Sequence, residues 1–120
     1  MSEAKTYQGS CHCGRVQYEV SLDLEKPVLA CNCSMCGRSG TLLTFVGPDS
    51  FKLLRGEESL TDYQFNKNVI HHLFCSTCGI KAFARGKKQT GEDIVAVNVR
   101  CLDGVDANAL KVQHVDGKSV

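Results

Sequence analysis

The sequence predicts a mainly β protein in which two small sheets are clamped by metal. Apolar stretches recur as short strands about every 8–12 residues, and no segment keeps a 3.6-residue apolar period over two turns. Seven of the eight cysteines fall into three groups, at spacings typical of zinc ligands. In a chain of 120 residues, a bound metal would contribute much of the folding free energy.

The clearest strand is expected at residues 15–22, where apolar and polar side chains alternate as in a strand with one buried face. Residues 55–58, Arg-Gly-Glu-Glu, are expected to close a hairpin between two further strands. The most continuous apolar strand is expected at residues 94–100. The remaining strands are expected at residues 28–30, 41–46, 51–54, 60–65, 69–74, 80–84 and 110–114.

Charge and hydropathy exclude several classes of partner. The 14 basic and 13 acidic residues give a net charge of +1, so no field draws the chain to nucleic acid or to an anionic membrane. No stretch approaches the roughly 18 apolar residues of a membrane span, and residues 1–7 lack the apolar core of a signal peptide. We therefore expect one domain over residues 1–120, acting in the cytoplasm as a monomer or homodimer.

The central cysteine run is Cys31-Asn32-Cys33-Ser34-Met35-Cys36. Three thiols fall within six residues, and no fourth ligand is adjacent. Three protein ligands plus one open position are typical of a zinc ion that takes part in chemistry. The pattern therefore predicts a reactive metal site at Cys31, Cys33 and Cys36.

The pair Cys75 and Cys78, followed by Gly79, has the spacing of an ordinary zinc knuckle. It needs two more ligands, which either Cys11 and Cys13 or two members of the central run can supply, and spacing alone does not decide between them. A glycine just past such a turn, as at Gly14, permits a positive φ, so that backbone amides can point at sulfur.

Two other interpretations of the cysteines are less favoured. Stable disulfides are uncommon in the reducing cytoplasm, and the Cys-x-Cys spacing suits two thiolates on one ion. A redox Cys-x-x-Cys motif belongs at the start of a helix in a βαβ unit, and the pattern predicts no helix. Cys101 is either a buried, inert thiol or a group near the open site.

The histidines give a weaker signal. His71 and His72 alternate sides on the expected strand, so at most one of them faces any given site. Either is a candidate fourth ligand or proton-transfer group, and the alternative is a partly exposed histidine with no such role.

At these residues the chain resembles the glutathione-dependent formaldehyde-activating enzyme family, also called the centromere-protein-V-like family. The resemblance covers about residues 9–106. It rests on four stretches that occur in the family's order: residues 9–14, 31–36, 71–79 and 97–103. It implies a β-tent of small antiparallel sheets around two zinc ions per chain. In that arrangement Cys11 and Cys13 join Cys75 and Cys78 in a closed structural site, and Cys31, Cys33 and Cys36 hold a catalytic zinc.

The resemblance also implies an activity, that of a carbon–sulfur lyase interconverting S-hydroxymethylglutathione with glutathione and formaldehyde. Glutathione would be the co-substrate and a small thiol–aldehyde adduct the partner. The family commonly follows the central run with two basic residues, whereas this chain has Gly37, Arg38 and Ser39. Arg38 is then the one cation left there to bind a glutathione carboxylate. The alternatives are a non-catalytic zinc-stabilised binding module and a redox or metal-handling role.

Overall fold

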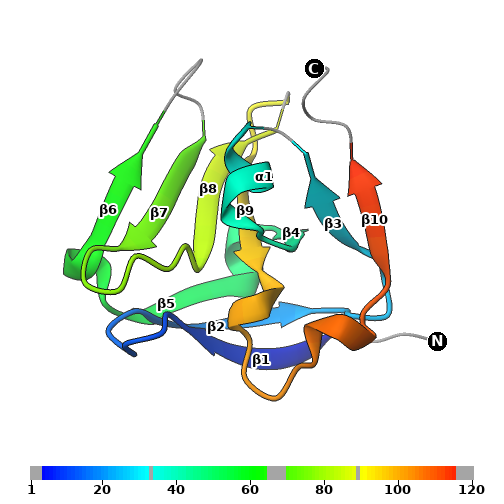
Figure 1. Cartoon of the computed structure of the whole chain (residues 1–120), viewed down its shortest axis with the longest axis horizontal. Coiled ribbons are helices and arrows are strands. Elements are labelled where there is room, and N and C mark those ends of the chain that lie inside the picture. The colour runs from blue at the N-terminus through cyan, green and yellow to red at the C-terminus, as the bar shows by residue number, and fades with distance from the viewer. Residues whose placement is uncertain (1–3, 33, 65–69, 89, 116–120) are drawn as a thin grey trace.

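Two β-sheets form the molecule, with the three-stranded sheet lying across one end of the seven-stranded sheet (Figure 1). The computed structural model describes residues 4–32, 34–64, 70–88 and 90–115, and of Ser34 and Cys36 it describes the main chain alone. The mainly β class predicted from the sequence is confirmed. Within the described residues, no helix is long and apolar enough to cross a membrane.

The three-stranded sheet is antiparallel and has the order β1-β2-β5. Its strands are β1 (Lys5–Ser10), β2 (Gln17–Leu22) and β5 (Phe51–Arg55). Residues 5–10 were not expected to be a strand, because the inward positions Tyr7 and Gly9 give only a weak alternating pattern. Pairing with the strongly alternating β2 makes this segment a strand.

The seven-stranded sheet has the order β10-β3-β4-β9-β8-β7-β6. All its neighbouring strands are antiparallel except β10 and β3, which are parallel. Its strands are β3 (Val28–Cys31), β4 (Leu43–Val46), β6 (Leu60–Tyr63), β7 (His71–Cys75), β8 (Phe83–Lys87), β9 (Asp93–Asn98) and β10 (Val112–Val115).

Short helical segments connect the strands. One is the α-helix α1 (Ser34–Ser39), which follows β3. The others are single 3-10 turns: η1 (Pro48–Ser50), η2 (Glu57–Ser59), η3 (Val99–Cys101) and η4 (Ala107–Ala109). The expectation of no helix was wrong for residues 34–39, because six residues are too few to produce a helical period.

The expected hairpin between residues 51–54 and 60–65 was also wrong. Strand β5 pairs with β2 and strand β6 pairs with β7, so the two lie in different sheets. The turn at Gly56, with φ of 97°, and the following η2 send the chain from one sheet to the other. The ends of two expected strands, at Phe65 and Val69, lie outside the described residues.

The core lies between the sheets and centres on Tyr18, Phe51 and Phe83. Their rings are 4.7 to 5.9 Å apart, centroid to centroid. Tyr18 of β2 and Phe83 of β8 are completely buried, and the β9 residues Val95 and Val97 pack with them. One face of the seven-stranded sheet therefore packs against the core.

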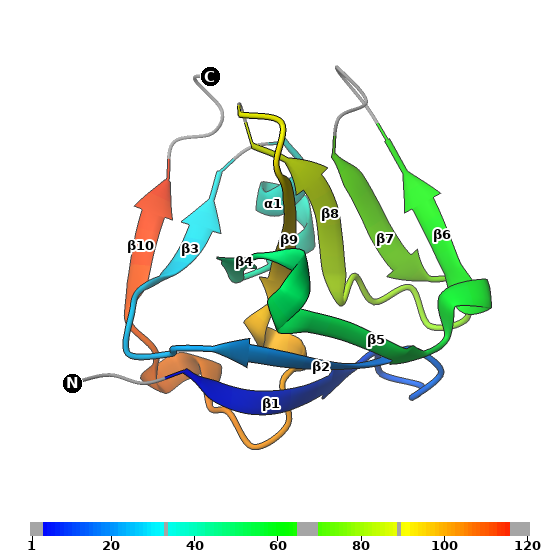
Figure 2. The same cartoon turned by 180° about the vertical axis from the view of Figure 1, so that it is seen from behind.

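The other face of the seven-stranded sheet carries Leu43, Ala84 and Ala96, which form a second, smaller cluster with Cys31. Helix α1 begins three residues after Cys31 and lies in front of β9 in Figure 1 and behind it in Figure 2. We call this surface the Cys31 face. It is separated by the thickness of the sheet from the core that contains Cys75.

Candidate metal centre

Four cysteines from distant parts of the chain converge at one point. Cys11 and Cys13 lie in the loop between β1 and β2, and Cys75 and Cys78 lie at the end of β7 and in the turn that follows. All four sulfur atoms lie within 4.8 Å of one another. The Sγ atom of Cys13 is 3.6 Å from those of both Cys11 and Cys75.

This spacing fits a tetrahedral zinc ion. Sulfur atoms at about 2.3 Å from zinc lie about 3.8 Å apart in a tetrahedron. A disulfide would instead require about 2.05 Å between sulfurs. Four thiols also form the closed ligand set typical of a structural zinc, with no position left for a substrate. The cluster is therefore suited to hold one metal ion in a structural role.

The two cysteine turns have the same local geometry. Gly14 and Gly79 both adopt φ of 81°, a left-handed conformation that glycine adopts without strain. The Gly79 amide donates to the Cys75 carbonyl at 2.8 Å, and the Val16 amide donates to the Cys11 sulfur at 3.3 Å. As expected, the glycine after Cys13 allows the turn that directs an amide toward sulfur.

Backbone amides, burial and neighbouring thiols shift the acidity of three of these thiols. The Cys78 amide lowers the pKa of Cys75 against the effect of burial. Burial raises the pKa of Cys78, but amides of Cys13 and Ile80 outweigh it and bring the pKa to about 6. The Arg15 amide lowers the pKa of Cys13, while burial and the neighbouring thiols raise it to about 11. Metal binding at this cluster would therefore release protons.

Cys101 lies beside this cluster without belonging to it. Burial raises the pKa of its thiol to about 11, and the charges of Cys11 and Cys78 add to that effect. Its electrostatic neighbours are therefore two of the clustered cysteines, Cys11 and Cys78. Of the two interpretations from the sequence, the partly buried, inert thiol fits this position.

The second predicted metal site is only partly visible. Cys31 ends β3 and is half-buried against Leu43, Ala84 and Ala96. Cys33 and the side chain of Cys36 lie outside the described residues, so the site at Cys31, Cys33 and Cys36 stays a prediction. Arg38 is exposed in the last turn of α1.

The helix at Cys36 does not make the central run a thioredoxin-type motif. In such motifs the helix connects two parallel strands of a βαβ unit. Here α1 connects β3 and β4, which pair antiparallel. The redox interpretation therefore lacks its structural context even though a helix is present.

The two neighbouring histidines face opposite sides of the sheet, as the sequence predicts. His72 pairs across the ladder with Ala84 and so lies on the Cys31 face, whereas His71 pairs with Arg85 on the core side. The Nδ1 atom of His72 is 2.8 Å from the Lys81 Nζ atom, and both side chains are buried. No sequence pattern points to Lys81, because its position beside His72 depends on how β7 and β8 pair.

An apolar cleft of about 250 Å³ lies on the Cys31 face. Ala84 and Ala96, which pack with Cys31, form part of its wall. Phe45 and Ile70 also line it and are 48% and 50% exposed, which is unusual for such large apolar side chains. Cys31 packs against these two alanines but does not itself line the cleft.

Fold and cysteine geometry together define a mainly β protein with a metal-binding cluster of four cysteines. The chain belongs to the family of the glutathione-dependent formaldehyde-activating enzyme, whose model matches residues 6–115. It is also similar to the crystal structure of a Rhodobacter sphaeroides protein, with 34% sequence identity and a TM-score of 0.79. That similarity covers 90% of this chain and 99% of the other.

Proposed function

We propose that this chain is a zinc-dependent carbon–sulfur lyase that interconverts a thiol–aldehyde adduct with its free thiol and aldehyde. Glutathione and formaldehyde are the first pair to test. Beyond the family match, the observation that carries the proposal is the position of Cys31. It packs against two wall residues of an apolar cleft and lies on the opposite face of the sheet from Cys75 of the four-cysteine cluster, so the chain has room for two separate metal sites.

In the lyase direction, the carbon–sulfur bond of a hydroxymethyl thioether breaks and its electron pair goes to sulfur. The hydroxyl proton is released as the aldehyde carbonyl forms. A zinc ion held by Cys31, Cys33 and Cys36 would supply a site for the thiolate and Lewis acidity toward the aldehyde oxygen. The thiolate ligands suit zinc, and bringing both reactants to one place accounts for much of the expected acceleration.

Residues of the Cys31 face would orient the reactants. The cleft walls at Ala84, Ala96 and Phe45 exclude water from one side of the adduct. The Lys81 ammonium donates to Nδ1 of His72, so a neutral His72 carries its proton on Nε2. This buried pair gives the Cys31 face a hydrogen-bond donor of fixed position, the Nε2–H group of His72. Arg38, exposed on α1, would pair with a substrate carboxylate.

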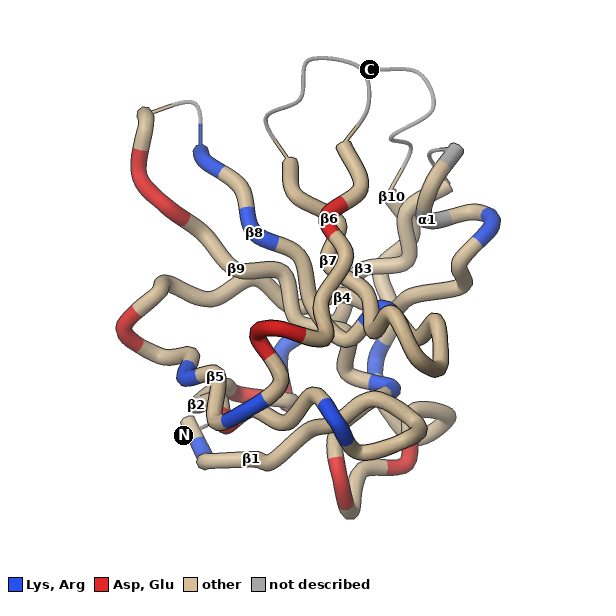
Figure 3. The backbone as a smooth tube through the Cα atoms, turned by 90° about the vertical axis from the view of Figure 1, so that its left-hand side faces the viewer, with Lys and Arg blue, Asp and Glu red and all other residues tan. Residues whose placement is uncertain are grey.

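The proposed partner is therefore a small molecule. Figure 3 shows acidic and basic positions interspersed along the described backbone, and the net charge is +1. Neither favours nucleic acid or an anionic membrane. We propose a monomer or homodimer that works in the reducing cytoplasm, where thiols and thiolate ligands persist.

The test is elemental analysis followed by exchange NMR of glutathione, formaldehyde and S-hydroxymethylglutathione. We expect two zinc ions per chain and a zinc-dependent acceleration over the uncatalysed exchange. Cys36→Ala should lose one zinc ion and the acceleration, whereas Cys101→Ala should keep both. Equal exchange rates with and without protein that holds both zinc ions would reject the glutathione reaction and favour a non-catalytic binding module.

A further inference from the structure

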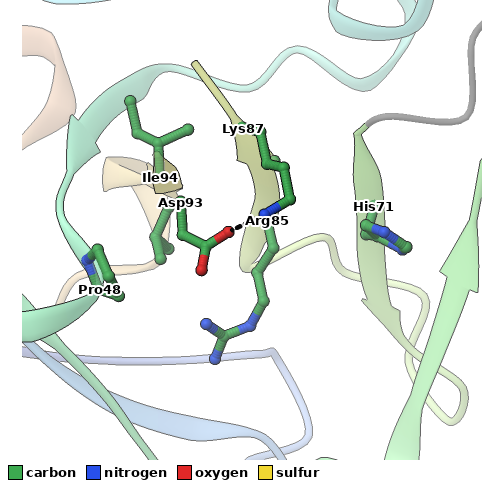
Figure 4. A pocket seen from close by; sticks show the side chains of 8 residues that line it. Pro48, His71, Arg85, Lys87, Asp93 and Ile94 are labelled. Atoms are coloured by element: carbon green, nitrogen blue, oxygen red, sulfur yellow. Dashed lines mark hydrogen bonds and ion pairs between the residues drawn. The ribbon is translucent and has the colours of Figure 1, made fainter. Parts of the chain in front are cut away.

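We propose that a second cleft, on the core side of the seven-stranded sheet, binds a small organic carboxylate through Arg85 (Figure 4). The cleft has a volume of about 260 Å³ and lies between η1 and strands β7, β8 and β9. In Figure 4 the Arg85 guanidinium extends into the middle of this space, with Pro48 on one side and His71 on the other.

Arg85 is held in place by two aromatic rings. Its Cζ atom is 5.3 Å from the ring centroids of both Phe51 and Phe83. Both rings belong to the core, and their centroids are 4.7 Å apart. Cation–π contact with this rigid platform orders the guanidinium before any ligand arrives, so less entropy is lost on binding.

The other charged groups at the cleft already have partners. Lys87 is 2.8 Å from Asp93, and Nδ1 of His71 is 2.6 Å from Asp62. None of the ion pairs in the described part of the chain uses Arg85. Its planar fork of N–H donors is therefore available to a ligand, and that geometry matches a carboxylate.

His71 provides a second polar contact. It lies directly opposite Arg85 on the neighbouring strand and lines the same cleft. Because the Asp62 carboxylate accepts from Nδ1 and fixes the ring, Nε2 is left for a ligand, and it donates to a carboxylate when the ring carries both protons. A carboxylate between Arg85 and His71 would contact groups from two adjacent strands.

The remaining walls indicate the kind of carboxylate. Pro48 and Val95 present an apolar surface suited to a short hydrocarbon body. An adjoining cavity shares His71 and Arg85 but also contains the carboxylates of Glu57 and Asp62. These acidic groups disfavour a polyanion such as a nucleotide. The cleft therefore suits a monocarboxylate better than a phosphate ester.

The polar contacts of this site lie on the other face of the sheet from the proposed lyase centre, although Arg85, Gly86, Lys87 and Ile94 also line the cleft on the Cys31 face. Arg85 and His71 point to the core side of the sheet, whereas Ala84 and His72 point to the Cys31 face. A carboxylate held between the Arg85 guanidinium and His71 would thus lie on the opposite face of the sheet from Cys31. Loss of carboxylate binding would leave the lyase proposal untouched, and failure of the lyase assay would leave this one untouched.

The test is a titration of the full, zinc-loaded chain with sodium butyrate at constant ionic strength, followed by amide NMR. We expect saturable shifts at His71, Asp93 and Val95, which line this cleft and not the cleft on the Cys31 face. Arg85→Gln should weaken binding at least about tenfold, and Arg85→Lys, which keeps the charge without the planar fork, should weaken it less. The matched control is Arg55→Gln, an exposed arginine on β5 that should bind butyrate like the natural chain.

Unchanged affinity in Arg85→Gln, or shifts that never saturate, would overturn the proposal. So would inorganic phosphate that binds as tightly as butyrate, since the acidic walls should disfavour it. If Arg85→Gln does not fold, Arg85→Lys decides the matter: affinity equal to that of the natural chain would contradict the role given to the guanidinium fork.

Discussion

The Nζ atom of Lys81 lies 2.8 Å from Nδ1 of His72, in a pair whose side chains are only 9% and 6% exposed. The ammonium can only donate, so the imidazole must accept and remain neutral at Nδ1. Burial lowers the pKa of His72, and the charge of Lys81 lowers it further, to about 4. His72 is thus held neutral in the folded protein well below the ordinary histidine pKa of 6.5.

This pair predicts that the protein loses stability in mild acid. The unfolded chain binds a proton at His72 near pH 6.5, whereas the folded protein resists until about pH 4. The unfolded state therefore binds more protons in that window, and stability falls as the pH falls through it, by up to about 3 kcal/mol. Urea unfolding at a series of pH values would measure the slope.

The matched variant for the acid effect is His72→Gln, which keeps a hydrogen-bond acceptor for Lys81 and cannot take up a proton. It should flatten the dependence of unfolding free energy on pH between about 6.5 and 4. An identical slope in the variant would show that other groups, such as the cysteine ligands, cause the acid sensitivity.

The four-cysteine cluster predicts a large difference between two cysteine substitutions. Cys75→Ser should lose one zinc ion per chain and destabilise the fold by more than about 3 kcal/mol, because a structural metal contributes its binding energy to folding. Cys101→Ala removes a partly buried thiol outside the cluster, so it should cost about 1 kcal/mol and keep the zinc content. Elemental analysis and thermal unfolding of both variants would check this.

Most strands were predictable because their signal is local. Residues 17–22 alternate between buried and half-buried positions, as a period of two requires. The pairing of β5 with β2 was not predictable in this way, because a strand's partner depends on the turn at Gly56 and on core packing far along the chain. Helix α1 was not predictable either, because its six residues are too few for a 3.6-residue apolar period to repeat.

In the candidate metal centre, too, the local features were predictable from the sequence and the long-range contacts were not. The spacing within each cysteine pair is a local feature, and it indicates zinc. Spacing alone did not predict that Cys11 and Cys13 lie next to Cys75 and Cys78 in the fold. Only the family resemblance implied that pairing. Lys81 and Arg85 left no trace in the sequence, since their importance comes from His72 on a neighbouring strand and from rings on two sheets.

Gly9 predicts a stability change from a single added methyl group. A Cβ atom there would lie 2.4 Å from Cζ of Tyr18, whose ring is fully buried between the sheets and has no room to move. Gly9→Ala should therefore destabilise the protein by about 2–3 kcal/mol through overpacking. The comparison is Gly47→Ala, where no atom lies within 4 Å and φ is −73°. Chemical denaturation should find Gly47→Ala within about 0.5 kcal/mol of the natural chain, and similar losses in both variants would contradict the packing argument.

The side chain of Asn98 links the end of β9 to the main chain at Lys81. Its side-chain amide donates to the Lys81 carbonyl at 3.0 Å, and its side-chain oxygen accepts from the Arg100 amide at 3.2 Å. The side chain is buried, so Asn98→Ala should cost about 2 kcal/mol by removing both bonds. Asn108→Ala, an exposed position in η4, should cost less than about 0.5 kcal/mol.

The same variant tests whether Asn98 positions Lys81. If it does, Asn98→Ala should also raise the pKa of His72 toward its ordinary value, because Lys81 no longer holds its place beside the ring. Histidine NMR titration of the folded variant would measure this. A loss of stability with the pKa of His72 unchanged would mean that Asn98 serves only the end of β9, through its bond to Arg100, and that Lys81 is positioned by other contacts.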